Sequence, residues 1–492
     1  MRNTRIITTL LFVLLSLGVW AQVPDTAGMN DFEKAFFAFD KAAKERYESF
    51  RDQCNKTYAE GLRQAWDIYQ GRKPVPLPKE EPLPPVPYED KGELIEDKPV
   101  VIEEVIDIPA PTPQPQPVEP IEEKPQPVEQ WLTFTLYGTP MKVRLADEQR
   151  FRLPNTSPSA VADAWQRLSA GAYDNALYDC LALRQRHQLC DWSYLQMLDA
   201  LCNAYLSEGT SEAELLKGFL FCQSGYQMRF GVAQGKLVML YGSRHRFLEK
   251  GWWEMDGICY YADHCQAEQI QISPVAYPHE KAMSLYVTQE PRLNLSSSPR
   301  RTLQSSYQPA LTASVTSNRN LMAFCEQYPT SVVGDDFMTR WAMYAQMPLS
   351  SQARQELYPQ LRKLIEGKSN YDAVNLLCRW VQTAFVYEYD DKVWGRDRAF
   401  FADETLYYPY ADCEDRSILL TRIVRDLLGL DCLLVFYPGH LATAIALGDN
   451  ARGDYIILNG KRYLVCDPTY IGAPIGCTME GMDNRTAKVI KL

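Results

Sequence analysis

The sequence predicts a mixed α+β fold, in which a helix that opens with a cysteine packs on an antiparallel sheet. Three observations predict this. Apolar residues at helical spacing follow Cys413 and stop at Gly429, and short apolar runs separated by turn residues come next. Asn459-Gly460 joins two of these runs and is the strongest short hairpin signal. With 492 residues of which 46% are hydrophobic, the chain is expected to form two to four structural units.

The chain begins with the features of an export signal. Arg2 and Arg5 precede an apolar run, and Val19-Trp20-Ala21 supplies small residues at the positions that a signal peptidase inspects. Residues 1–21 are therefore expected to be a signal peptide cleaved near Ala21, and the mature protein to be secreted or periplasmic. The apolar run is too short for a comfortable membrane span and no comparable run follows, so no transmembrane span is expected in the mature form.

Residues 22–72 are predicted to form an amphipathic helical segment. Between residues 30 and 69, apolar side chains recur at steps of three and four with charges between them. The stripe consists of Phe32, Phe36, Phe39, Tyr47, Phe50, Tyr58, Leu62, Ala65 and Tyr69. Such a stripe is expected to pack on its own protein or to self-associate, and binding of a separate partner is the alternative.

Residues 73–130 are predicted to be a linker rich in proline and glutamate. Residues 73–129 hold 16 of the 32 prolines, together with 14 acidic and 5 basic side chains. Proline removes backbone donors and fixes φ, so this composition favours extended polyproline II over a packed core. The linker carries −9 of the total net charge of −11. The rest of the chain is nearly neutral, which argues against a nucleic-acid surface.

Three further parts follow the linker. We expect residues 131–280 to form an α+β module, residues 281–350 a connecting region of strands and loops, and residues 351–492 a catalytic domain. The thirteen cysteines lie mostly in apolar segments and are expected to be buried free thiols. No zinc-ligand spacing occurs and there are only five histidines, so neither a metal nor a cofactor is expected.

The informative stretch surrounds Cys413. Loop-forming residues end at Asp412, a good helix N-cap, and Glu414 and Asp415 place carboxylates in the first turn. Cys413 is therefore expected at or beside the first helical position, where the helix dipole and a nearby imidazole favour the reactive thiolate. The flanking acids oppose this, because they repel a second negative charge.

A histidine and an aspartate follow at equal spacing, His440 27 residues after Cys413 and Asp467 another 27 residues on. His440 opens one predicted strand, and Asp467 ends another. Antiparallel pairing would bring these two ends together beside the cysteine helix, which is a workable geometry for a nucleophile, a base and a group that orients the base.

These residues resemble the transglutaminase-like superfamily, in particular its bacterial cysteine peptidases. The resemblance covers roughly residues 371–476 and rests on Asp-Cys-Glu-Asp at the cysteine, a histidine after a short hairpin, and Asp-Pro-Thr-Tyr around the third residue. It implies a papain-like or transglutaminase-like core with the catalytic triad Cys413, His440 and Asp467. Ala411-Asp412 departs from the pattern, because many relatives have glycine there.

The resemblance also implies what the triad does. Cys413 would attack an amide carbonyl in a peptide, a protein or a cell-wall substrate, His440 would activate it, and Asp467 would orient the imidazole. The Cys413 backbone N–H and an upstream side chain, for which Trp394 is the candidate, would bind the oxyanion. Two alternatives stay open: a non-catalytic binding or scaffold protein that keeps this fold, and a transamidase that crosslinks proteins.

The middle of the chain resembles the C-terminal part at an offset of 204 residues. Leu215, Leu216, Gly225, Gly235 and Leu237 match Leu419, Leu420, Gly429, Gly439 and Leu441. In this alignment the triad positions hold Gly209, Lys236 and His264, which cannot perform the same chemistry. Residues 131–280 are therefore a candidate degenerate copy, although helix–hairpin composition alone can produce such a match.

Overall fold

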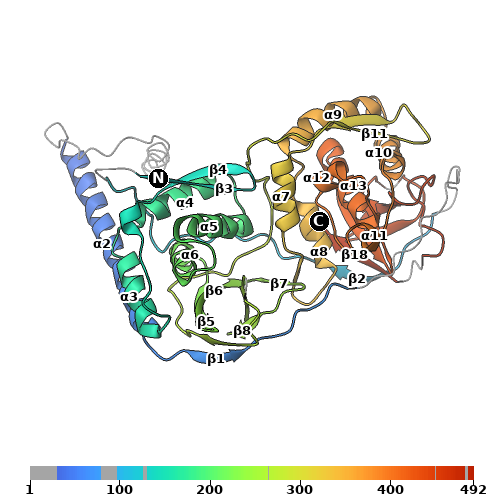
Figure 1. The fold of residues 1–492 in the computed structure, drawn as a ribbon. Helices are drawn as coiled ribbons and strands as arrows, with labels where there is room; N and C mark the ends of the chain where they lie inside the picture. The colour runs from blue at the N-terminus through green and yellow to red at the C-terminus, as the bar shows by residue number, and fades with distance from the viewer. Residues whose placement is uncertain (1–29, 79–96, 126–129, 264, 449, 483–485) are drawn as a thin grey trace. The chain divides into compact units, whose positions relative to one another are not determined.

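The structure is a computed structural model that describes residues 30–78, 97–125, 130–263, 265–448, 450–482 and 486–492. These residues form a mixed α+β fold, as the sequence predicted (Figure 1). The chain divides into two units, residues 1–53 and residues 54–492. The predicted signal peptide lies outside the described residues. Among the helices that are described, none combines the length and the apolar character needed to cross a membrane.

The elements follow one another along the chain. The helices are α2 (Asp31–Leu62), η2 (Asp147–Gln149), α3 (Pro158–Leu168), α4 (Asp174–Arg186), α5 (Asp191–Leu206), α6 (Ser211–Gln223), α7 (Arg319–Gln327), α8 (Thr339–Gln346), α9 (Ser351–Ile365), α10 (Asn370–Ala384), α11 (Asp390–Val393), α12 (Ala402–Tyr407) and α13 (Cys413–Leu428). The strands are β1 (Asp67–Gln70), β2 (Ile102–Ile106), β3 (Trp131–Leu136), β4 (Thr139–Arg144), β5 (Met228–Ala233), β6 (Lys236–Ser243), β7 (His245–Phe247), β8 (Trp253–Met255), β9 (Ile258–Ala262), β10 (Gln269–Ile272), β11 (Arg301–Gln304), β12 (Thr312–Val315), β13 (Ser331–Val333), β14 (Cys432–Tyr437), β15 (His440–Ile445), β16 (Tyr455–Leu458), β17 (Lys461–Cys466) and β18 (Ala487–Lys491).

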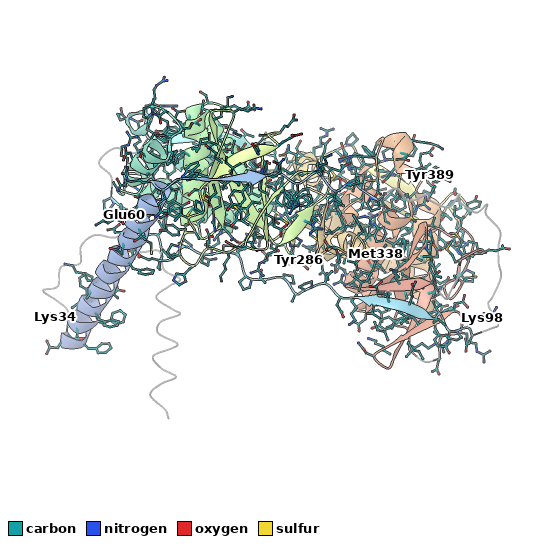
Figure 2. All side chains as sticks on the ribbon, turned by 90° about the horizontal axis from the view of Figure 1, so that it is seen from below. Lys34, Glu60, Lys98, Tyr286, Met338 and Tyr389 are labelled. Atoms are coloured by element: carbon teal, nitrogen blue, oxygen red, sulfur yellow. The ribbon has the colours of Figure 1, made fainter. Side chains whose placement is uncertain are left out.

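The first unit contributes the beginning of α2. Asn30 caps it, since its side-chain oxygen accepts the Glu33 amide at 2.9 Å and its own amide donates to the Glu33 carboxylate at 2.9 Å. Phe32 and Phe39 of the predicted stripe are 78% and 72% exposed (Figure 2, where Lys34 marks this part of the helix). The predicted helix is shorter than expected at its other end. Tyr69 lies in β1 instead, because residues 67–70 pair with β10.

The C-terminal module, residues 351–492, is built on a six-stranded sheet in the order β16-β17-β15-β14-β18-β2. All pairs are antiparallel except β18 with β2. Helix α13 packs on β14 and β15, whose residues are all buried. The helix-on-sheet arrangement that the sequence predicted for this region is therefore present.

The middle module, residues 131–280, has a sheet of the same order, β8-β9-β6-β5-β10-β1. Helix α6 packs on β5 and β6 as α13 packs on β14 and β15. Strand β5 runs from Met228 to Ala233, and strand β14 runs from Cys432 to Tyr437. The two strands therefore begin and end 204 residues apart in the sequence. The outermost strands differ, because β1 is antiparallel to β10 whereas β2 is parallel to β18. The two modules thus share five strands and a helix in the same connectivity.

Two of the predicted segments contain regular structure that was not expected from the sequence. Residues 73–130 are not only a linker, since residues 102–106 form β2 at the edge of the C-terminal sheet. Ile106 is buried and Ile102 half-buried, and these two apolar residues are hidden in the composition of the whole segment. Proline-rich residues also dock on the middle module, where Gln114 donates to the Leu189 carbonyl at 2.9 Å. The connecting region 281–350 contains helices α7 and α8 in addition to strands and loops.

Candidate functional site

The start of α13 places Cys413 as the first helical residue. Asp412 is the N-cap, and its carboxylate accepts the Asp415 amide at 3.5 Å while the Asp415 carboxylate accepts the Asp412 amide at 3.3 Å. This reciprocal pair satisfies two donors that the helix cannot. The helix ends at Gly429 in the left-handed conformation, φ 64°. Both ends agree with the sequence prediction.

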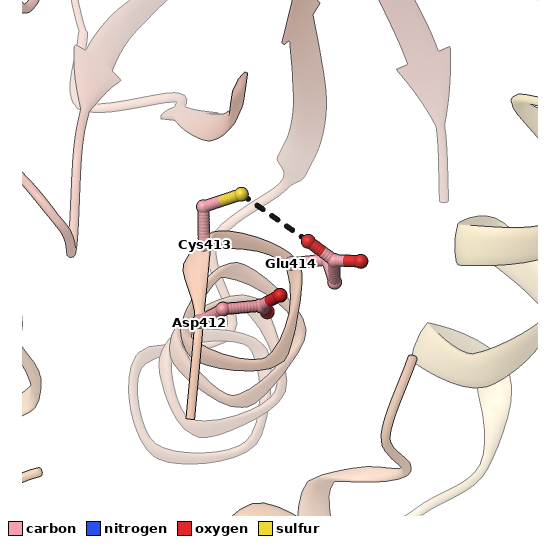
Figure 3. A group of neighbouring side chains, drawn as sticks. All are labelled: Asp412, Cys413 and Glu414. Carbon is pink, nitrogen blue, oxygen red and sulfur yellow. Dashed lines mark hydrogen bonds between the residues drawn. The ribbon is translucent and has the colours of Figure 1, made fainter. Parts of the chain in front are cut away.

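The thiol of Cys413 lies in the wall of a cavity of about 700 Å³. Its side chain is only 5% exposed, so the cavity gives it its access to ligands. The thiol donates a hydrogen bond to Oε2 of Glu414, with the sulfur 3.2 Å away (Figure 3). Gly439, immediately before His440, lines the same cavity.

Burial raises the pKa of the Cys413 thiol well above its usual value, and the charges of Glu414 and Asp412 raise it further. The backbone amide of Leu441 lowers the pKa of this thiol, which is a smaller effect. The thiol is therefore protonated at rest. The expected benefit from the helix dipole is outweighed by desolvation and by the two flanking carboxylates.

His440 and Asp467 form the most direct pair of the site. His440 Nε2 lies 2.8 Å from Oδ2 of Asp467, and both side chains are at least 96% buried. The other Asp467 oxygen accepts the amides of Thr469 and Tyr470 at 2.8 and 3.1 Å. The Asp-Pro-Thr-Tyr sequence thus forms a turn that fixes the carboxylate toward the imidazole.

The orientation of the ring follows from this pair. Because Nε2 is bonded to Asp467, Nδ1 is the nitrogen left for a proton from elsewhere. The neighbours of His440 on both sides reach the cysteine: Gly439 lines the cavity with Cys413, and the Leu441 amide acts on the sulfur. The chain therefore brings the start of β15 to the start of α13.

Trp394, the predicted oxyanion residue, packs away from the cavity. Its ring centroid lies 4.8 Å from that of Tyr408 and 5.7 Å from that of Phe400, and the Arg398 guanidinium lies 4.5 Å above it. It is not among the residues that line the cavity. Trp394 is therefore not placed to donate a hydrogen bond into the cavity.

Tyr387 is the residue that sequence reasoning missed. Burial raises the pKa of its phenol, and the charge of Cys413 is the next cause. The two groups therefore lie near each other, but no hydrogen bond joins them among the described residues, and Tyr387 does not line the cavity. The guanidinium of Arg416 lies 5.4 Å from the centre of the Tyr387 ring. Tyr389, two residues on, does line the cavity. A tyrosine soon after a helix and ahead of the nucleophile was the signal available, but only the fold distinguishes these two residues.

Arg416 is buried under the first turn of α13 and holds the surrounding loops. It donates to the carbonyls of Ala411, Gln382 and Phe385 at 3.2, 3.1 and 2.9 Å. Burial lowers the pKa of the Arg416 guanidinium to about 10, and the charges of Asp412 and Asp415 act in the opposite direction. The guanidinium thereby offsets part of the negative charge that gathers at this helix start.

Carboxylates dominate one side of the cavity. Asp390 lies within 4.8 Å of Asp412 and Asp415, and likewise of Asp397 and Glu414, measured between single ligand atoms. Burial and the charge of Glu414 raise the pKa of Asp390 to about 8. These oxygens are the groups that could hold a hard cation. Their repulsion also favours a bound proton on part of the cluster.

The corresponding site of the middle module has a different composition. Helix α6 begins at Ser211 after the N-cap Thr210, so Ser211, and not Gly209, stands where Cys413 stands in α13. The ungapped alignment missed this because α6 has 13 residues whereas α13 has 16. Lys236 opens β6 as His440 opens β15, and Asp263 follows β9 as Asp467 follows β17. His264 lies outside the described residues.

The side chains of this second site do not form a hydrogen bond like the one between His440 and Asp467. Ser211 accepts the Leu237 amide at 3.1 Å, the counterpart of the Leu441 amide at Cys413. Asp263, however, is bonded to Tyr241, at 3.0 Å, and to Lys250. Lys236 is exposed. The position of the nucleophile is kept, whereas the base and its carboxylate partner are not.

Comparison of the chain with models of protein families, with curated proteins and with solved structures finds no match.

Proposed function

We propose that the C-terminal module is a cysteine-nucleophile enzyme of the transglutaminase-like type that acts on amide bonds. The observation that carries this proposal is the buried pair of His440 and Asp467, 2.8 Å apart, at the start of the strand whose next amide reaches the Cys413 sulfur. A buried histidine–aspartate pair, with the histidine on a strand that packs on the helix opened by a thiol, is an arrangement that nucleophilic catalysis can use. In the resting structure no hydrogen bond joins His440 to Cys413 among the described residues.

The chemistry follows from these positions. A substrate carbonyl enters the cavity, Nδ1 of His440 takes the thiol proton, and the Cys413 sulfur bonds to the carbonyl carbon. The carbonyl oxygen becomes an oxyanion, for which the Cys413 amide and the Tyr387 hydroxyl are the candidate donors. His440 then gives its proton to the amine as the carbon–nitrogen bond breaks, leaving a thioester. Asp467 stabilises the imidazolium throughout.

Water or a second amine would release the acyl group. Attack by water gives a peptidase or amidase, which is the first candidate. Attack by an amine gives a transamidase that crosslinks proteins. The carboxylates around the cavity favour approach of a cationic amine, so both outcomes are open to this site.

A second function, a non-catalytic binding or scaffold role, is favoured by one observation. The thiol is protonated, hydrogen-bonded to Glu414 and flanked by carboxylates that raise its pKa. A degenerate site would look the same at rest. The two readings differ once substrate is present, because only the enzyme can transfer the thiol proton to His440.

We also propose that the middle module is an inactive copy of the C-terminal one. The shared strand order and the shared serine or cysteine position support this. Export of the protein by residues 1–21 remains part of the proposal, with a peptide, a protein or a cell-wall amide as substrate.

The test is activity profiling of the full chain against Cys413→Ser on peptide and cell-wall amide libraries. The proposal predicts new amines released, or new amide crosslinks formed, by the wild type and not by the variant. Equal product profiles with an unchanged set of bound partners would support the scaffold role instead.

A further inference from the structure

A short segment of the middle module, residues 153–156, crosses the place that corresponds to the C-terminal cavity. The amide of Leu153 donates to the Glu212 carboxylate at 2.9 Å, and the hydroxyl of Thr156 donates to the Gly235 carbonyl at 3.2 Å. Glu212 follows Ser211, and Gly235 lies two residues before the amide that bonds to Ser211. The chain's own residues therefore span the two sides of the serine.

Both partners of this segment have counterparts in the C-terminal module. Glu414 follows Cys413 as Glu212 follows Ser211, and Gly439 precedes β15 as Gly235 precedes β6. Glu414 and Gly439 both line the 700 Å³ cavity. In the middle module, Glu212 and Gly235 accept hydrogen bonds from residues 153–156. In the C-terminal module, their counterparts Glu414 and Gly439 lie in the cavity wall, where a ligand can meet them.

The C-terminal cavity already meets a piece of the chain itself. Pro78, in a stretch without regular secondary structure from residue 73, is part of its wall. An irregular stretch of chain, rather than a helix or a strand, therefore lies at this place in both modules.

We infer that the acyl-donor substrate is a peptide segment that lies between Glu414 and Gly439, along the bent path that residues 153–156 take over Ser211. This inference rests on the proposed function of Cys413. One substrate N–H donates to the Glu414 carboxylate, and a second donor further along the peptide donates to the Gly439 carbonyl. The carbonyl that follows is presented to the sulfur.

This path also explains how binding frees the thiol. At rest, Glu414 accepts the hydrogen bond from Cys413. A substrate N–H competes for the same carboxylate and partly neutralises the charge that raises the pKa of the thiol. The thiol proton then passes to His440. Peptide binding and activation of the nucleophile are coupled through Glu414.

The test uses the full chain and a probe copied from the segment, acetyl-Leu-Pro-Asn-Thr with a C-terminal acyloxymethyl ketone. The Cys413 sulfur displaces the carboxylate from the methylene carbon, the thiol proton leaves, and a thioether forms. The matched probe carries a methyl group on the leucine nitrogen, which removes only the N–H that Leu153 uses. Iodoacetamide, which has no peptide, reports the thiol itself in wild type and in His440→Ala. Intact-protein and peptide mass spectrometry give the labelling rates.

On the wild type, the N-methyl probe should label Cys413 at least tenfold more slowly than the unmethylated peptide probe. In Glu414→Gln, the ratio of the peptide-probe rate to the iodoacetamide rate should fall by a similar factor relative to the wild type. Glu212→Gln should change neither. Equal rates for the two peptide probes, while iodoacetamide still labels Cys413 in a His440-dependent way, would overturn the path and leave the proposed function standing. Loss of His440 dependence with iodoacetamide would overturn both.

Discussion

The Cys413 sulfur lies 3.2 Å from Oε2 of Glu414, the next residue in the chain, and donates a hydrogen bond to it. The first turn of α13 thus holds the nucleophile and a carboxylate that opposes its ionisation. This relationship keeps the resting thiol protonated, so changes in local charge should alter thiol reactivity in a defined direction.

Replacing Glu414 by glutamine should make the thiol more reactive. The change removes the largest charge that raises the pKa of Cys413 and keeps a side chain of the same size. The rate of alkylation by iodoacetamide at pH 7 should rise about tenfold for each unit by which that pKa falls. The rate is measured on the peptide that contains Cys413. Glu212→Gln, at the corresponding position of the middle module, is the control, and an equal rise there would contradict this explanation.

Replacing Asp467 by asparagine should weaken catalysis without unfolding the module. Asparagine can still accept the Thr469 and Tyr470 amides, but it carries no charge to stabilise the imidazolium. We expect kcat on an active amide substrate to fall by about 10²-fold to 10⁴-fold. Asp263→Asn is the matched control. A wild-type kcat in Asp467→Asn, with an unchanged melting temperature, would show that the carboxylate has no catalytic part.

Tyr387 and Trp394 should differ in their effect on rate. Tyr387→Phe removes only the hydroxyl that feels the charge of Cys413, and we expect kcat to fall by about 10²-fold with little change in KM, as for loss of one oxyanion donor. Trp394→Phe keeps an aromatic ring against Tyr408 and should leave kcat within a few-fold. The reverse order of effects would restore the original assignment of Trp394.

The stability of the C-terminal module should fall as the pH rises from about 4 to 7. Burial raises the pKa of Asp403 to about 6, so the folded state keeps a proton there that the unfolded chain has already lost. The stabilisation by this proton is complete at a pH below the pKa of Asp403 in the unfolded chain. It is lost as the pH rises through the pKa of Asp403 in the folded state, and the loss in the free energy of unfolding is up to about 3 kcal/mol. Asp403→Asn keeps an acceptor for the Ser350 amide and should flatten the dependence of melting temperature on pH. Exposed Asp335→Asn should leave the slope as it is.

Much of the site could be predicted from local sequence. Asp412 and Gly429 mark the two ends of α13 by the rules of helix capping, and both were placed correctly. Asn459 and Gly460 have φ of 52° and 75°, the left-handed values that a tight hairpin requires, and β16 and β17 have the predicted bounds. Each of these features depends on neighbours in the chain.

The features that were missed depend on distant parts of the chain. β18 has a partner in β2, which lies in a proline-rich segment more than 380 residues away, as the pair of Lys488 and Glu104 illustrates. Tyr387 and Trp394 are both aromatic and both upstream of Cys413, and only the packing of the loop between α10 and α12 decides which of them interacts with the thiol. The shared topology of the two modules could be suspected from an offset of 204 residues, whereas Ser211 could be assigned only from the start of α6.

The most direct test is the rate at which an amide-mimicking, thiol-reactive probe labels Cys413 in wild type and in His440→Ala. If the buried His440–Asp467 pair accepts the thiol proton, labelling of the full chain is selective for Cys413 among its thirteen cysteines, and His440→Ala suppresses it at least tenfold. Labelling of Cys413 at the same rate in both proteins would contradict the assignment of a cysteine–histidine nucleophile.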